Sequence, residues 1–176
     1  MTDSLLPPEL TALARRVVEE NAAIGRKIAV AESCTGGLVA AALTEIPGSS
    51  AVVERGFVTY SNEAKHEMLG VPNAALRKFG AVSRQTAQAM ARGALKNSDA
   101  DIAVSITGIA GPGGATPGKP VGLVHFAAAA RGGRVIARAK KFGDIGRRKV
   151  RQKSVDEALA MLAALARAVR PRRRAG

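Results

Sequence analysis

The sequence feature that most constrains the fold is the junction at residues 28–37, where an apolar run meets a pair of glycines. The run Ile28-Ala29-Val30-Ala31 is followed directly by Glu32-Ser33-Cys34-Thr35-Gly36-Gly37. This order predicts a strand that turns at once into a helix. Such a corner presents a side-chain nucleophile at the end of a sheet, and we expect the N–H groups of the helix to be free for an anion or an oxyanion. Taken alone, the pattern favours a plainer interpretation, a helix cap with tight packing at the glycines.

The rest of the chain predicts helices and strands in alternation. Apolar residues at helical spacing predict helices over residues 8–24, 36–46, 62–69 and 84–96, and in a long final helix that reaches Val169. Strands are expected over residues 27–31, 52–60, 102–107, 121–128 and 135–142. Gly132 and Gly133 predict a hairpin between the last two strands. We therefore expect an α/β fold, a three-layer α/β/α sandwich whose mixed sheet is covered on both faces.

Length and charge predict one domain with a basic tail. The 176 residues fit a single domain over residues 1–170, followed by a tail at 171–176. The net charge of +13 is local, because residues 131–176 hold 15 Lys and Arg against 3 Asp and Glu, whereas residues 1–130 hold 12 against 11. No aromatic platform accompanies the basic end, so we expect no nucleic-acid binding beyond weak, salt-sensitive contacts of the tail.

Composition excludes several classes of protein. The single cysteine, Cys34, rules out an internal disulfide, and with only two histidines a transition-metal site would lack ligands, so neither metal nor cofactor is expected. The N-terminus has no signal-peptide pattern, and no apolar run is long enough to span a bilayer, so we expect a cytoplasmic protein without a membrane partner. With 47% apolar but 3% aromatic residues, the core is expected to depend on the close approach of small residues.

Three segments together resemble the C-terminal domain of the CinA family. They are Glu32–Gly37, Gly56–Lys65 and Ser105–Pro112, and residues 80–83 and 119–122 extend the resemblance over nearly the whole chain. Stand-alone members of this family are nicotinamide-nucleotide amidases of the PncC type. The resemblance is to this single-domain form, since no molybdopterin-binding-like domain precedes the segments. It implies a homodimer that hydrolyses nicotinamide mononucleotide to nicotinate mononucleotide and ammonia in pyridine-nucleotide recycling.

Amide hydrolysis needs a nucleophile, a base and an oxyanion site, and three residues fit the first two roles. Ser33 is the best nucleophile and Lys65 the best base, provided that desolvation lowers the lysine pKa. Tyr60, the only tyrosine, is expected to relay or orient the proton between them. The resemblance implies the same Ser/Tyr/Lys set. The alternatives are a helix cap for Ser33, a core position for Tyr60 and a solvated side chain for Lys65. Cys34 lacks a neighbouring histidine, so we expect a buried residue there.

A substrate phosphate would need hydrogen-bond donors. We expect them from the backbone of the turn Thr107-Gly108-Ile109-Ala110-Gly111 and from Arg147 or Arg148 at the start of the last helix, although simple surface charge is an equal alternative for this arginine pair. Further expected contacts to substrate come from the nucleophile segment and from the short helix, at Cys34, Thr35, Gly36 and Asn62.

Two other functions stay open at this stage. The first is a non-catalytic nucleotide-binding module, such as a regulatory partner linked to competence. The second is a basic nucleic-acid-binding protein, which rests only on the charge distribution.

Overall fold

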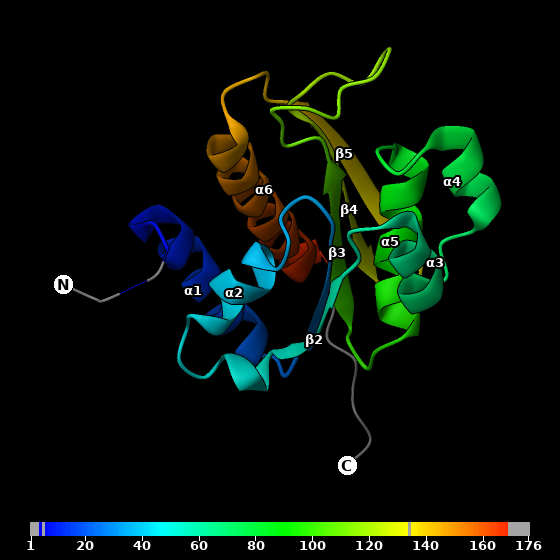
Figure 1. The fold of residues 1–176 in the computed structure, drawn as a ribbon. Helices are drawn as coiled ribbons and strands as arrows, with labels where there is room; N and C mark the ends of the chain where they lie inside the picture. The colour runs from blue at the N-terminus through cyan, green and yellow to red at the C-terminus, as the bar shows by residue number, and fades with distance from the viewer. Residues whose placement is uncertain (1–3, 5, 134, 169–176) are drawn as a thin grey trace.

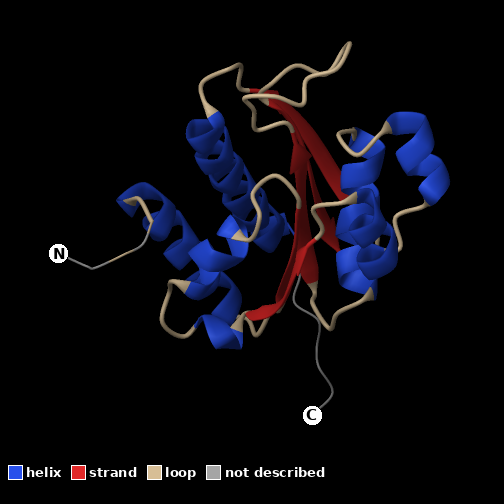
Figure 2. Cartoon of the chain, in the orientation of Figure 1, coloured by secondary structure: helices blue, strands red, loops and turns tan. Residues whose placement is uncertain are grey.

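The computed structural model describes residues 4, 6–133 and 135–168, and within them five strands form one mixed sheet (Figures 1 and 2). The strands are β1 Ile28–Glu32, β2 Val53–Val58, β3 Ile102–Gly108, β4 Leu123–Ala130 and β5 Val135–Lys141. Their order is β2-β1-β3-β4-β5. Strands β2, β1 and β3 are parallel, whereas β4 is antiparallel to both β3 and β5. The predicted mixed sheet and its hairpin are confirmed. The predicted tail at 171–176 lies outside the described residues.

Helices cover both faces of this sheet, as Figure 1 shows. One face carries α1 Pro8–Ala22, α2 Leu38–Thr44 and α6 Arg147–Ala168, and the other carries α3 Asn62–Leu69, α4 Asn73–Phe79 and α5 Arg84–Lys96. A single 3₁₀ turn, η1 Ser49–Ala51, precedes β2. Helix α4 was not predicted, because it is short and buries only Leu76, so it has no apolar stripe. None of the helices in the described part could cross a membrane.

The two faces of the sheet differ in the size of their side chains. Ile28, Val30 and Val104 point into the core beneath α1, α2 and α6, whereas Ala29 and Ala103 point toward α5. Successive residues of a strand alternate between faces, so a strand that alternates large and small residues builds one thick and one thin layer. The alanine-rich face lets α5 lie close to the sheet, which confirms the expected packing by small residues.

Helices α5 and α3 also approach closely, at Gly93. A Cβ at this position would overlap the carbonyl oxygen of Leu69. Alanine normally stabilises a helix interior relative to glycine by about 0.5–1 kcal/mol. Here we expect Gly93→Ala to lower the free energy of unfolding by about 1–3 kcal/mol, because an overpacked contact must move backbone. Urea denaturation measures the change.

Arg92→Ala is the matched control, since Arg92 is exposed on the same helix. It should shift the urea midpoint little. A Gly93→Ala variant as stable as the unmodified protein would contradict the close approach of these two helices.

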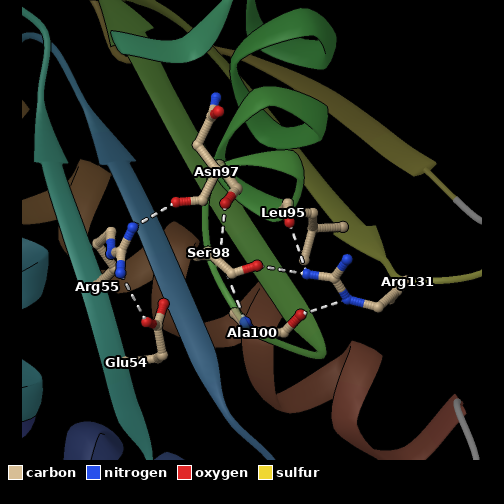
Figure 3. A network of polar contacts seen from close by, with 8 residues as sticks. Glu54, Arg55, Leu95, Asn97, Ser98, Ala100 and Arg131 are labelled. Atoms are coloured by element: carbon tan, nitrogen blue, oxygen red, sulfur yellow. Dashed lines mark hydrogen bonds and ion pairs between the residues drawn. The ribbon is translucent and has the colours of Figure 1, made fainter.

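Arginine side chains hold the C-terminal end of α5 (Figure 3). Arg131, directly after β4, donates from Nε to the carbonyl of Ala100 at 2.9 Å and from one terminal nitrogen to Leu95 and Ser98 at 2.6 and 2.7 Å. Arg55 of β2 donates to the carbonyl of Asn97 at 2.7 Å. The last carbonyls of a helix lack intrahelical partners, so these donors stabilise the turn that leads from α5 into β3.

The strand order places three chain segments at one edge of the sheet. Because β1, β2 and β3 are parallel, their carboxyl ends meet, and residues 33–37, 59–65 and 109–114 follow directly. The chain leaves β1 over one face, through α2, and leaves β2 over the other, through α3, α4 and α5. Such a change of side opens a crevice in which α/β proteins bind ligands. Strand β5 ends at the same edge, so α6 begins there.

Candidate active site

A cavity of about 270 Å³ opens at this edge of the sheet. Ser33, Tyr60 and Lys65 line it, and so do most of the expected binding residues. These are Cys34, Thr107, Gly108, Ile109, Ala110, Gly111 and Arg147. The structure thus brings together Ser33, which follows β1, Tyr60, which follows β2, and Lys65 of α3 with the end of β3 and the turn after it.

Four expected residues lie outside this cavity. Thr35 is buried, and its carbonyl accepts a hydrogen bond from Arg151 at 2.9 Å. Gly36 has a positive φ of 59° in the turn before α2. Asn62 is exposed in the first turn of α3, and Arg148 lines a neighbouring cavity instead.

Four lining residues were missed from the sequence, namely Ala81, Val82, Gly113 and Gly114. Ala81 and Val82 connect α4 to α5, where Ser83 caps α5 by accepting from the Thr86 N–H at 3.2 Å. The Ser83 cap was predicted from the sequence. Because α4 was not predicted, the sequence did not indicate that the loop between α4 and α5 lies at the site.

Ser33 and Lys65 form a direct hydrogen bond. Lys65 Nζ lies 3.0 Å from Ser33 Oγ, and only 1% of the lysine is exposed. The same amine donates to the carbonyl of Thr59 at 2.7 Å, with the carbonyls of Tyr60 and Ser61 at 3.4 Å. Ser61 also caps α3, which fixes the helix start and turns Lys65 back toward the sheet.

The environment of Lys65 suits a general base. Burial lowers the pKa of Lys65 from 10.5 to about 8, and attraction to Cys34 and Glu63 opposes this only in part. An uncharged amine keeps two N–H groups for the surrounding carbonyls and turns its lone pair to Ser33 Oγ. The uncharged Lys65 amine can therefore take the proton of the Ser33 hydroxyl.

Tyr60 occupies the rim of the cavity rather than the space between Ser33 and Lys65. It is 62% exposed, and its hydroxyl accepts a hydrogen bond from Arg147 at 3.3 Å. Only its backbone carbonyl approaches Lys65. Because Ser33 and Lys65 touch directly, the proton needs no relay through the Tyr60 hydroxyl in this geometry.

The N-terminus of α2 is not free to hold an anion, and that expectation was wrong. Glu32, the last residue of β1, is 1% exposed, and its carboxylate accepts from the N–H groups of Gly37 and Val39 at 3.1 Å and of Ala40 at 2.9 Å. The charge of Glu32 thus compensates the positive end of the helix. The Gly36 N–H donates to the Ser33 carbonyl at 3.0 Å.

Two N–H groups remain beside the nucleophile. Within the described residues, those of Cys34 and Thr35 have no backbone acceptor. They follow Ser33 directly in the sequence, so an oxygen bound to the carbon that Ser33 attacks could reach them.

Cys34 is buried beside Ser33 with 5% of its surface exposed. Burial raises the pKa of the Cys34 thiol to about 11; the charge of Glu32 acts in the same direction, whereas a backbone hydrogen bond and the charges of Arg151 and Lys65 oppose it in part. A thiol that stays protonated at neutral pH is a poor nucleophile, because the thiolate is the reactive form. Ser33 is the better candidate on this ground.

The end of β3 and the turn after it pack tightly on β4 and on the residues just before it. A Cβ at Gly108 would lie 2.7 Å from the Val124 side chain, and one at Gly111, where φ is 81°, would lie 2.7 Å from Val121. The Ile109 N–H is unavailable to a ligand, contrary to expectation, because it donates to the Leu123 carbonyl at 2.9 Å. Among the described residues, the N–H groups of Ala110, Gly111, Gly113 and Gly114 have no backbone acceptor.

Arg147 brings positive charge to this turn. It donates to the Gly111 carbonyl at 3.0 Å as well as to the Tyr60 hydroxyl. Thr107 instead uses its hydroxyl within the protein, donating to the Ala81 carbonyl at 2.8 Å. In the part of the chain that the structure describes, no three His, Cys, Asp or Glu residues gather to hold a metal ion.

Comparison with known proteins gives one consistent family. A family model described as the CinA C-terminal domain matches residues 10–166. A protein of Escherichia coli named nicotinamide-nucleotide amidohydrolase PncC is 51% identical over 163 residues, which cover 92% of this chain and 95% of that protein. A protein of the same name from Enterobacter agglomerans is 53% identical over 128 residues, covering 71% of this chain and 78% of that protein.

Other relatives are longer. A CinA-like protein of Akkermansia muciniphila is 54% identical over 129 residues, which cover 73% of this chain but 31% of that protein. The chain spans less than a third of the length of the first curated relatives it matches.

Among solved structures, the competence/damage inducible protein CihA from Agrobacterium tumefaciens superposes with a TM-score of 0.91 at 57% identity, covering 92% of this chain and 98% of that one.

Proposed function

The chain belongs to the CinA C-terminal domain family, and on this premise we propose that it is a nicotinamide-nucleotide amidase. It hydrolyses the carboxamide of nicotinamide mononucleotide to nicotinate mononucleotide and ammonia. The observation that carries the proposal is the 3.0 Å hydrogen bond between Ser33 Oγ and the buried Lys65 amine, at the wall of the cavity. A serine activated by a desolvated lysine suits attack on an amide.

The proposed reaction has two stages. Lys65 takes the proton of Ser33 as Oγ bonds to the carboxamide carbon, and the resulting ammonium returns that proton to the departing nitrogen, so ammonia leaves and an ester remains on Ser33. Water then attacks the ester with Lys65 again as base, and the serine hydroxyl is restored as the carboxylate leaves. The N–H groups of Cys34 and Thr35 would stabilise the negative oxygen in both stages.

The phosphate of the substrate would lie at the other end of the cavity. Arg147 and the N–H groups of Ala110, Gly111, Gly113 and Gly114 would supply donors there, and Tyr60 would position Arg147 through its hydroxyl. Arg148 lines the neighbouring cavity, so Arg147 is the member of the pair that we assign to the phosphate.

Incubation with nicotinamide mononucleotide tests the proposal. Purified protein in EDTA should release ammonia and nicotinate mononucleotide in equal amounts. Binding of the nucleotide without either product would instead indicate a non-catalytic nucleotide-binding module.

The phosphate assignment predicts strong discrimination against nicotinamide riboside. A charge-assisted hydrogen bond contributes about 1.5–3 kcal/mol, so loss of one contact should lower kcat/KM about 10- to 150-fold. Arg147→Ala should weaken the mononucleotide reaction by a similar factor and the riboside reaction little. Steady-state kinetics on both substrates measure this.

Lys149→Ala is the control, because Lys149 is exposed in the same turn and lines neither cavity. Equal efficiency of the unmodified protein on both substrates would contradict the phosphate site.

The lysine base predicts a rise of activity with pH. Only the uncharged amine accepts a proton, and its fraction increases through the Lys65 pKa of about 8. We expect kcat/KM to rise about tenfold per pH unit below that value and to level off above it, since this ratio reports the free enzyme. Cys34→Ala should keep the same profile, and a profile that stays flat between pH 6 and 9 would exclude Lys65 as the titrating base.

A further inference from the structure

A second cavity, of about 460 Å³, is lined by residues of α1, α2 and α6 and of the segment that precedes α1. Arg147 lines both cavities. The mechanism proposed above uses no other part of the larger cavity. Its volume is in the range of about 300–1,000 Å³ that is usual for sites that bind small molecules.

The wall of this second cavity combines apolar and cationic side chains. Leu10 and Val155 are almost fully buried, and Leu6 and Leu38 lie beside them. The first two turns of α6 contribute the positive charge, through Arg147, Arg148 and Arg151.

Within the described residues, no carboxylate forms an ion pair with these arginines, although other arginines of the chain do form ion pairs. Arg147 and Arg151 are held by neutral acceptors, on Gly111, Tyr60 and Thr35. Three guanidinium groups against an apolar wall complement an anion that carries an apolar body.

We propose that this cavity is a second binding site, for a small organic phosphate with an apolar body. The phosphate lies against the arginines of α6, because a guanidinium group can donate two parallel hydrogen bonds to phosphate oxygens. The apolar body lies against Leu10 and Leu38. A ligand there competes for Arg147 and so weakens the binding of the substrate phosphate. This effect on turnover rests on the proposed function, whereas binding itself does not.

Adenosine 5′-monophosphate is a suitable probe, because it joins a phosphate to a flat ring system. In calorimetry on the full chain it should bind more tightly than adenosine, which lacks the phosphate, and than inorganic phosphate, which lacks the apolar body. Kinetically, it should raise the KM for nicotinamide mononucleotide to a plateau. A KM that rises without limit would place the probe in the active-site cavity and overturn the proposal.

Two variants with the same change of charge locate the binding. Gln152 lines the second cavity but not the active-site cavity. Gln152→Glu places a carboxylate beside the phosphate and should weaken binding of the probe about tenfold or more. The KM for nicotinamide mononucleotide measured without probe should stay the same. Lys149→Gln, three residues earlier and outside both cavities, should leave binding unchanged.

No binding of the probe, or equal binding by Gln152→Glu and the unmodified protein, would overturn the second site. If the protein binds the probe as expected but releases no ammonia from nicotinamide mononucleotide, the proposed function fails and the second site stands.

Discussion

Replacing Ser33 by alanine is expected to reduce ammonia release from nicotinamide mononucleotide by about 10⁴- to 10⁶-fold, the loss typical of a removed nucleophile. The change deletes one oxygen at the wall of the cavity and leaves Arg147 and residues 110–114 in place. Ground-state binding should therefore change little, and calorimetry should show that the inactive variant still binds nicotinamide mononucleotide.

The neighbouring thiol provides the control for this substitution. Cys34→Ala should retain most activity, because burial keeps the thiol protonated. An active Ser33→Ala protein together with an inactive Cys34→Ala protein would assign the nucleophile to the thiol.

Replacing Lys65 by alanine is expected to lower kcat by about 10²- to 10⁴-fold, the usual contribution of a positioned acid–base group. Lys65→Arg should not restore activity, since a guanidinium group stays protonated and cannot accept the serine proton. Turnover is measured at pH 8, near the pKa of Lys65, and circular dichroism confirms that both variants fold.

Lys78→Ala is the matched control, because Lys78 is exposed on α4 and does not line the cavity. It should turn over at the normal rate. An active Lys65→Arg protein would reduce Lys65 to an electrostatic contact and exclude it as the base.

Much of the fold could be predicted because strong local signals agree with the tertiary structure. The Ser83 cap and the apolar stripe predicted a helix over residues 84–96, and the observed helix α5 has the same bounds, Arg84–Lys96. The order of the strands could not be predicted, since it depends on which edges pair across long stretches of chain. Helix α4 was missed because packing of Leu76, rather than an apolar periodicity, supports it.

The candidate site shows a similar division. The segments that carry Ser33 and Lys65 stand out in the sequence, but the partner of the α2 N-terminus does not. The sequence indicates only that Glu32 follows a predicted strand. The tertiary structure shows that its carboxylate accepts hydrogen bonds from three N–H groups at the start of α2. Likewise, Arg147 and Arg148 are adjacent in sequence and both line the larger cavity, but only Arg147 also reaches the cavity of Ser33 and Lys65. The predicted homodimer stays a prediction.

The most direct test of the account compares ammonia release by three proteins purified in the same way: the unmodified protein, Cys34→Ala and Ser33→Ala. Each is incubated with nicotinamide mononucleotide in EDTA at pH 8. The amounts of ammonia and of nicotinate mononucleotide formed per mole of protein are measured and compared. The account predicts equal amounts of both products from the unmodified protein and from Cys34→Ala, and neither product from Ser33→Ala. Turnover by Ser33→Ala at the unmodified rate, or no product from any of the three, would contradict it.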